Sequence, residues 1–353
     1  MAHPYQPAAR SFYEPSRAFV DSGPGTTTRE CRITPSEPPY DRRTIASESE
    51  DPMNREDIEF QGEHGVTLRG WFYPARNTIT PAPVVVLAHG LSCVKEMHLD
   101  DYAVVFSEAG LNVLAYDHRN FGDSEGTPRQ EVDPVLQYRD FRNAITYATT
   151  RPEVDASKIG IWGSSFSGGH VLMVAAIDKR VKAVVSQVPF ITGPRTLSRA
   201  IRPDFIPVFR AIQEGDRLNR FTGGEPAMLP VVAADPTAQA VMPAADAYEW
   251  FSKTWADRAP NWKNELTARS MEMVTEYAPG TFISRIAPTP LLMIVADNDR
   301  VAPFELALDA YEEAREPKQI IVKQGGHFDF YSGPGFDELS AAARDHFVKH
   351  LRG

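Results

Sequence analysis

A serine flanked by small residues stands out as a candidate nucleophile. Residues 163–169 read Gly-Ser-Ser-Phe-Ser-Gly-Gly and lie between a predicted strand and a predicted helix. A serine on a sharp strand-to-helix turn needs small residues two positions before and after it, because the turn brings two stretches of backbone close together. Gly163 and Ser167 meet that need around Ser165, which is therefore the predicted nucleophile. A register centred on Ser167, with Ser165 and Gly169 beside it, is the alternative.

A serine hydroxyl becomes an effective nucleophile when a histidine removes its proton and an acid orients that histidine. In one order of such triads the acid and then the histidine follow the serine along the chain. Asp299 lies just after the predicted strand Leu291–Val295, and His327 follows two glycines after the predicted strand Gln319–Val322. We therefore predict Asp299 as the acid and His327 as the base, with Asp297 as the competing acid.

Acyl transfer to serine also needs backbone N–H groups that stabilise negative charge on the carbonyl oxygen. Phe166, the residue after the predicted nucleophile, supplies one of them. The second is predicted to come from Leu91, because the strand Val84–Ala88 continues into the loop His-Gly-Leu. His89 in that loop precedes the serine and is predicted to shape the loop rather than to act as a base. This chemistry needs no metal ion and no cofactor, and we predict neither.

Other polar residues receive structural interpretations. His346 and His350 follow the predicted acid, but they belong to the terminal helix and are expected at the surface. Asp117, His118 and Arg119 follow a buried strand, and a loop that carries both charges can satisfy itself. They are therefore expected to pair with one another.

The elements that must position these residues alternate between strands and helices. Short runs rich in β-branched residues predict buried strands, and apolar residues at helical spacing predict the helices between them. The predicted strands are Ile58–Gln61, Thr67–Tyr73, Val84–Ala88, Leu111–Tyr116, Lys158–Trp162, Ala183–Ser186, Leu291–Val295 and Gln319–Val322. The predicted helices are Leu99–Ala109, Val135–Thr149, Phe166–Ile177, Ala245–Trp255, Leu266–Tyr277, Phe304–Arg315 and Phe336–Leu351.

The alternation predicts an α/β fold with one mostly parallel central sheet flanked by helices. It stops over residues 190–285, which are therefore predicted to form an inserted helical cap. Residues 56–189 and 286–353 form the predicted core, and the proline-rich residues 1–55 form a predicted flexible or loosely packed extension. The large apolar side chains of the cap are expected to wall an acyl pocket. They are Phe205, Phe209, Trp250, Phe251, Trp255, Met271 and Met273.

Composition excludes several classes of protein. The 353 residues are 42% hydrophobic and 24% charged, which is typical of a globular enzyme. A net charge of −10 argues against nucleic acid or an anionic membrane as a partner. With two cysteines and no stretch long enough to span a membrane, the chain is expected in the cytoplasm. A homodimer is compatible with the sequence.

Several segments resemble the α/β-hydrolases, from about residue 57 to the C-terminus. The stretches that begin at His89, Tyr116, Trp162 and Trp262 are similar to the dienelactone-hydrolase-like group, which includes fungal polyketide transferases and thiohydrolases as well as bacterial hydrolases. The resemblance implies an α/β-hydrolase fold, a triad of Ser165, Asp299 and His327, and an acyl substrate that is an ester or a carrier-bound thioester.

The function expected from the sequence is that of a serine-dependent hydrolase or acyltransferase for a hydrophobic acyl group. A peptidase or a carbon–carbon-bond hydrolase could use the same triad. A non-catalytic ligand receptor on this fold would usually lack one of its members, whereas all three residue types are present here.

Overall fold

The computed structural model describes residues 55–200, 203–235 and 238–353. The predicted extension over residues 1–55 therefore lies outside the described residues, apart from Arg55. Among the described residues, eight strands form one sheet in the order β1-β2-β4-β3-β5-β6-β9-β10. These strands are β1 (Glu56–Gln61), β2 (Thr67–Tyr73), β3 (Ala82–Ala88), β4 (Asn112–Tyr116), β5 (Val154–Ser164), β6 (Val181–Gln187), β9 (Leu291–Ala296) and β10 (Lys318–Lys323).

The sheet is mostly parallel, as the sequence predicts. β2 pairs antiparallel with both β1 and β4, and every other neighbouring pair is parallel. The parallel strands β3, β4 and β9 are buried at every residue, which explains their unbroken apolar runs. Their carboxyl ends meet at one edge of the sheet, where the loops that follow them converge.

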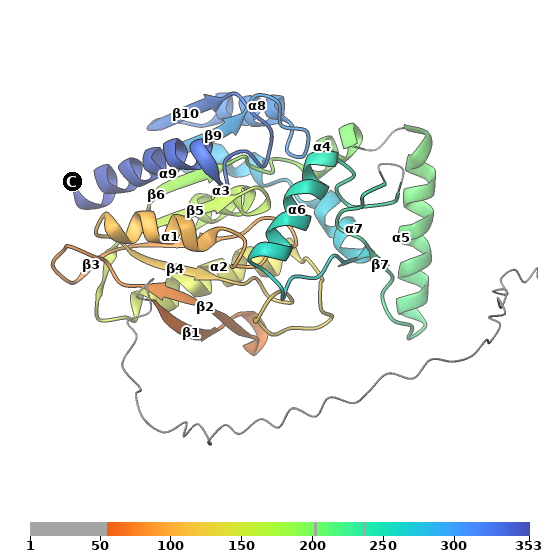
Figure 1. Ribbon diagram of the computed structural model, residues 1–353, viewed down its shortest axis with the longest axis horizontal. Coiled ribbons are helices and arrows are strands. Elements are labelled where there is room, and N and C mark those ends of the chain that lie inside the picture. The colour runs from red at the N-terminus through yellow and green to blue at the C-terminus, as the bar shows by residue number, and fades with distance from the viewer. Residues whose placement is uncertain (1–54, 201–202, 236–237) are drawn as a thin grey trace, which may run out of the picture. The chain divides into compact units, whose positions relative to one another are not determined.

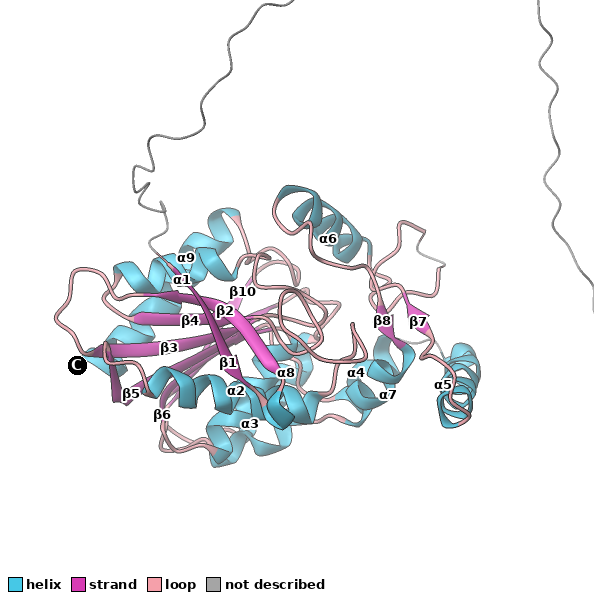
Figure 2. Ribbon diagram, turned by 90° about the horizontal axis from the view of Figure 1, so that it is seen from below, coloured by secondary structure: helices cyan, strands magenta, loops and turns pink. Residues whose placement is uncertain are grey.

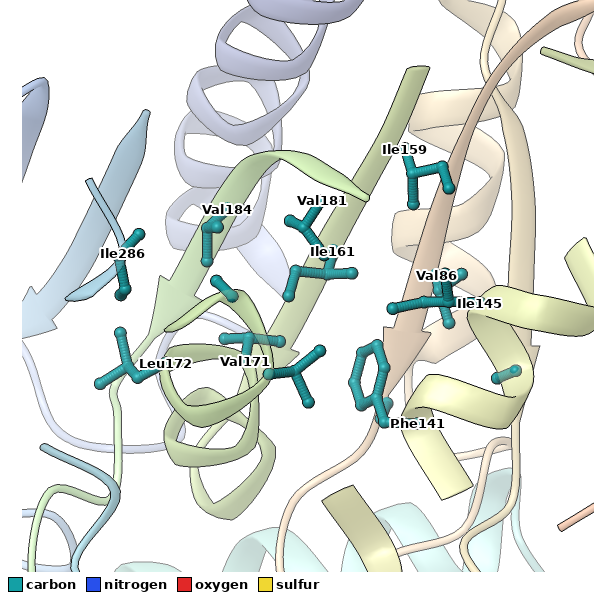
Figure 3. Close-up of a cluster of buried hydrophobic side chains, with 14 of the residues drawn as sticks. Val86, Phe141, Ile145, Ile159, Ile161, Val171, Leu172, Val181, Val184 and Ile286 are labelled. Carbon is teal, nitrogen blue, oxygen red and sulfur yellow. The ribbon is translucent and has the colours of Figure 1, made fainter. Parts of the chain in front are cut away.

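Helices cover both faces of the sheet (Figure 1). The helices of the core are α1 (Leu99–Glu108), α2 (Pro134–Thr149), α3 (Phe166–Ile177), α8 (Phe304–Glu313) and α9 (Gly333–Phe347). One buried cluster joins α2, α3 and α8 to the sheet, and Figure 3 shows Phe141 of α2 and Val171 of α3 beside Val86 and Ile161. A second cluster joins α1 and α9 to the opposite face. The predicted α/β fold, with a mostly parallel central sheet flanked by helices, is confirmed.

Among the described residues between 190 and 285, four α-helices and a small sheet gather at one end of the main sheet (Figures 1 and 2). They are α4 (Gly193–Ala200), α5 (Ile206–Phe221), α6 (Ala245–Asp257) and α7 (Ala268–Glu276), with β7 (Met228–Leu229) pairing antiparallel with β8 (Leu266–Thr267). The predicted helix Leu266–Tyr277 begins two residues late, because Thr267 caps α7 by accepting a hydrogen bond from the Ser270 N–H. The division of the chain at residues 190 and 285 stays a prediction.

No helix within the described residues is long and apolar enough to cross a membrane.

Candidate active site

Ser165 occupies a strained turn between β5 and α3. It has φ 57° and ψ −116°, a backbone conformation that residues other than glycine rarely adopt. Backbone hydrogen bonds hold the turn on both sides. The Ser165 N–H donates to the Gln187 carbonyl at 2.9 Å, and the Ser165 carbonyl accepts from the Phe190 N–H at 2.9 Å. The turn lifts Ser165 out of the regular strand and helix at the carboxyl edge of the sheet.

Gly163 has no room for a side chain. A Cβ at this position would lie 2.1 Å from the carbonyl oxygen of Ser167, which is backbone and cannot move away easily. The turn therefore requires glycine two residues before Ser165. The position two residues after Ser165 accepts serine, because the Ser167 hydroxyl has hydrogen-bond partners at the carbonyl of His89 and the imidazole of His118.

We expect Gly163→Ala to lower the free energy of unfolding by about 3 kcal/mol, since a methyl group is forced against backbone. Gly215→Ala is the matched control, because this glycine lies within α5 and nothing lies within 4 Å of its Cβ position. The control should gain up to about 1 kcal/mol from the better helix propensity of alanine. Urea unfolding of both variants checks the prediction, and equal stability would contradict it.

Ser165, His327 and Asp299 lie in one chain of hydrogen bonds. His327 Nε2 lies 3.0 Å from Ser165 Oγ, and His327 Nδ1 lies 2.7 Å from Asp299 Oδ2. The other carboxylate oxygen of Asp299 accepts from the N–H groups of Val301 and Ala302, at 2.8 and 2.7 Å. His327 is 1% exposed and Asp299 9% exposed, so the hydrogen bond between these two side chains is shielded from water.

The competing residues lie elsewhere. The Asp297 carboxylate is exposed and accepts a hydrogen bond from the Gly325 N–H at 3.1 Å, which joins the loop after β9 to the loop that carries His327. Ser167 is fully buried and contacts His118 rather than His327. Of the two candidate serines and two candidate acids, the structure brings Ser165 and Asp299 to His327.

The two predicted oxyanion donors lie beside Ser165. Phe166 is the first residue of α3, so its N–H belongs to the first turn, where the helix offers no carbonyl partner. Gly90, which precedes Leu91, packs so closely that a Cβ there would lie 3.1 Å from Ser165 Cβ. Leu91, Ser165 and Phe166 line the same cavity.

This cavity has a volume of about 700 Å³. Residues 190–285 supply most of its apolar wall, and residues from the loops after β9 and β10 also line it. Its apolar lining includes Leu91, Phe166, Phe190, Leu197, Val241, Met242, Pro243, Ala244, Met271, Val274, Val301 and Ala302. Its charged lining consists of Arg199, Asp246, Arg300 and Asp329.

The prediction that the large apolar side chains of residues 190–285 line the cavity is only partly correct. Met271 lines the large cavity. Trp250 and Phe251 line a smaller pocket of about 10 Å³, which Ser165 and His327 also line. Phe205 and Trp255 are 47% and 48% exposed and line neither space. Phe209 and Met273 line neither space either. Met242 borders both spaces, although the sequence gives no periodic signal that would mark it.

The expectation that Asp117, His118 and Arg119 pair with one another is wrong. Lys95 Nζ donates to the Asp117 carboxylate at 2.9 Å. Arg119 makes two hydrogen bonds to the Asp140 carboxylate, at 2.5 and 2.7 Å. Each of these two charged groups pairs with an opposite charge from another part of the chain, which the tertiary structure places beside it.

Three acidic groups converge near this loop. The carboxylates of Glu96, Asp117 and Asp123 approach one another as metal ligands would. Lys95 Nζ lies 2.8, 2.9 and 2.5 Å from the three of them. Burial alone would lower the pKa of Lys95, but the charges of Asp117 and Glu96 outweigh it and raise that pKa. An ammonium group therefore occupies the centre of this cluster.

Five of the described histidines other than His327 are buried, namely His89, His98, His118, His170 and His346. Burial lowers the pKa of His89 to about 4 and of His170 to about 3, and it lowers that of His118 well below its usual value. These side chains are therefore neutral at pH 7. His346 is also buried, at 8% exposed, so the expected surface position for it is wrong. It lies on the same face of α9 as the buried residues Leu339, Ala343 and Phe347.

The sequence matches the alpha/beta hydrolase family over residues 85–337. Among curated proteins, it is 32% identical to a thiohydrolase of Eupenicillium brefeldianum, over 85% of this chain and 95% of the relative. It is 35% identical to the quorum-quenching protein AidA of Acinetobacter baumannii, over 84% of this chain and 94% of the relative.

Solved structures agree with these matches. The alpha/beta hydrolase GrgF from Penicillium sp. sh18 superposes with a TM-score of 0.73 at 28% identity, covering 85% of this chain and 99% of GrgF. The sequence match and the fold lead to the same family. The chain belongs to the alpha/beta hydrolase family and is an enzyme, either a hydrolase or an acyltransferase.

Proposed function

We propose that this protein is a serine-dependent hydrolase or acyltransferase that acts on an ester or thioester of a hydrophobic acyl group. The observation that carries the proposal is the hydrogen-bonded chain from Asp299 through His327 to Ser165, beside a cavity of about 700 Å³. The apolar majority of the cavity lining suits an acyl chain. The thiohydrolase relative supports a thioester as one substrate class, either free or carrier-bound.

In the proposed acylation step, Ser165 Oγ attacks the carbonyl carbon of the substrate while its proton moves to His327 Nε2. The carbonyl oxygen gains negative charge and is stabilised by the N–H groups of Leu91 and Phe166. His327 then gives the proton to the departing oxygen or sulfur, and the bond from the carbonyl carbon to that atom breaks. An acyl-enzyme on Ser165 remains.

In the proposed deacylation step, water or an alcohol attacks the acyl-enzyme and gives its proton to His327 Nε2. His327 returns this proton to Ser165 Oγ as the ester bond to the serine breaks. Asp299 accepts the hydrogen bond from His327 Nδ1 throughout, so that Nε2 is free to take a proton. It also stabilises the imidazolium that forms twice in each cycle.

Product analysis tests the proposal. The protein is incubated with hexanoyl esters and hexanoyl thioesters, with and without an alcohol, and the products are identified by mass spectrometry. Free hexanoic acid, formed both with and without the alcohol, indicates a hydrolase. A new ester, formed in the presence of the alcohol, indicates an acyltransferase. Absence of both products, together with no covalent labelling by a fluorophosphonate, would overturn the proposal.

Catalytic efficiency should rise with the length of the acyl chain until the cavity is full. Each buried methylene contributes about 0.8 kcal/mol, or about a fourfold gain in kcat/KM. Measuring kcat/KM for p-nitrophenyl esters from acetyl to octanoyl checks this dependence.

A pair of substitutions on α7 sharpens the chain-length test. Val274 lines the cavity, and Val274→Phe should abolish the gain for the longest chains. Met273 lies on the same helix outside the cavity lining, and Met273→Phe should leave the profile unchanged. A flat profile in the unmodified protein would reject the acyl pocket.

A further inference from the structure

The loop before Leu91 is held by hydrogen bonds that the catalytic steps above do not use. The His118 backbone N–H contacts His89 Nε2 at 3.1 Å, and the His118 imidazole Nε2 lies 2.8 Å from Ser167 Oγ. Ser167 Oγ contacts the His89 carbonyl at 2.5 Å, and His89 Nδ1 contacts the Gly90 carbonyl at 2.9 Å. All three side chains are at most 3% exposed.

The position of each proton follows from these contacts. A backbone N–H only donates, so His89 Nε2 must accept from His118, and His89 carries its proton on Nδ1. His89 Nδ1 therefore donates to the Gly90 carbonyl. The His89 carbonyl only accepts, so the Ser167 hydroxyl donates to it, and His118 Nε2 must donate to Ser167. Both imidazoles are neutral in this arrangement, which agrees with the low pKa values that burial gives them.

The Gly90 carbonyl connects the hydrogen bond from His89 to the orientation of the Leu91 N–H. It belongs to the same planar peptide group as the Leu91 N–H, so fixing the direction of the carbonyl fixes the direction of the N–H. The His89 imidazole thus aims the Leu91 N–H through the peptide plane. The Ser167 hydroxyl fastens the same loop to the first turn of α3, where the Phe166 N–H lies.

We propose that His89, His118 and Ser167 are positioning residues that set the Leu91 and Phe166 N–H groups relative to each other. This inference rests on the proposed function, in which these two groups stabilise the oxyanion. The network joins the loops after β3 and β4 to α3, so it spans the two segments that supply the donors. Loss of the network should weaken transition-state binding and leave ground-state binding intact.

The two histidines allow a crossed test, in which the same substitution should preserve activity at one position and lower it at the other. The reason is that each histidine uses a different ring nitrogen as its side-chain donor. An asparagine amide nitrogen mimics Nδ1 of histidine, and a glutamine amide nitrogen mimics Nε2. His89→Asn and His118→Gln keep the donors to the Gly90 carbonyl and to Ser167, and should retain kcat within a few-fold. His89→Gln and His118→Asn lose them, and kcat should fall by about 10²-fold with KM unchanged.

Side-chain size cannot produce this pattern, since glutamine is larger than asparagine at both positions. The inference would be overturned if kcat were higher with glutamine than with asparagine at both positions, or higher with asparagine at both. It would also be overturned if all four variants had the kcat of the unmodified protein. Urea unfolding identifies variants that fail to fold. Ser167→Ala, which removes one oxygen atom, then serves as the second test and should lower kcat without raising KM.

A transition-state analogue gives an independent readout. A hexyl trifluoromethyl ketone forms a hemiketal with the serine, and its oxyanion occupies the site of the two N–H groups. Its inhibition constant should rise in His89→Gln by the same factor by which kcat falls. If Ser165→Ala retains turnover, the proposed function fails. If turnover depends on Ser165 and the crossed pattern is absent, only the positioning role fails.

Discussion

Ser165→Ala is expected to lower kcat by about 10⁶-fold, which is the loss seen when a triad nucleophile is removed from a well-studied hydrolase. The substitution deletes the atom that would form the acyl-enzyme and leaves the surrounding backbone hydrogen bonds intact. Hydrolysis of p-nitrophenyl hexanoate measures the loss. A fluorophosphonate should label the unmodified protein and fail to label the variant.

Ser167→Ala is the matched control on the same turn. Its hydroxyl contacts His89 and His118 and does not reach His327 in the described structure, so its loss should cost about 10²-fold at most. Fluorophosphonate labelling of this variant should persist. If Ser167→Ala abolished labelling and Ser165→Ala did not, the nucleophile would be Ser167.

Asp299→Asn is expected to lower kcat by about 10⁴-fold. The single amide oxygen would keep the hydrogen bonds from the Val301 and Ala302 N–H groups, which places the NH₂ group against His327 Nδ1. His327 Nδ1 would then have to accept, and the ring proton would move to Nε2. A protonated Nε2 cannot take the proton of Ser165, so the base is lost although the packing is preserved.

Asp297→Asn makes the same chemical change two residues away. Its amide oxygen can still accept from the Gly325 N–H, so kcat should stay within a few-fold of the unmodified protein. Side-by-side steady-state kinetics of the two variants compare the acids directly. A larger loss in Asp297→Asn than in Asp299→Asn would move the acid to Asp297.

Local patterns in the sequence predict most of the sheet and the order of the site residues. The buried strand before Gly163 and the helix after Ser165 are short-range features. Chain order leaves His327, His346 and His350 as candidate bases, and the place of the last two on the terminal helix favours His327. The partners of buried charges cannot be predicted from such local patterns, because Arg119 and Asp140 meet only through tertiary packing. The sequence analysis does not predict α5, a helix in which Asp216 is the one buried residue and the apolar residues Val208 and Leu218 are exposed.

The role of Ser167 shows the same limit. The sequence presents it as one of the two small residues around Ser165 and as a rival nucleophile. Its actual partners, His89 and His118, come from loops after two other strands, and no spacing along the chain connects the three residues.

The positive φ of Ser165 links catalysis to the evolution of stability. A non-glycine residue in such a conformation costs about 1–3 kcal/mol, which the rest of the fold must offset. Glycine would relieve most of that strain and remove the hydroxyl at the same time. Selection for activity therefore keeps the less stable residue at this turn, and a descendant freed from that selection would gain stability by the substitution that ends its chemistry.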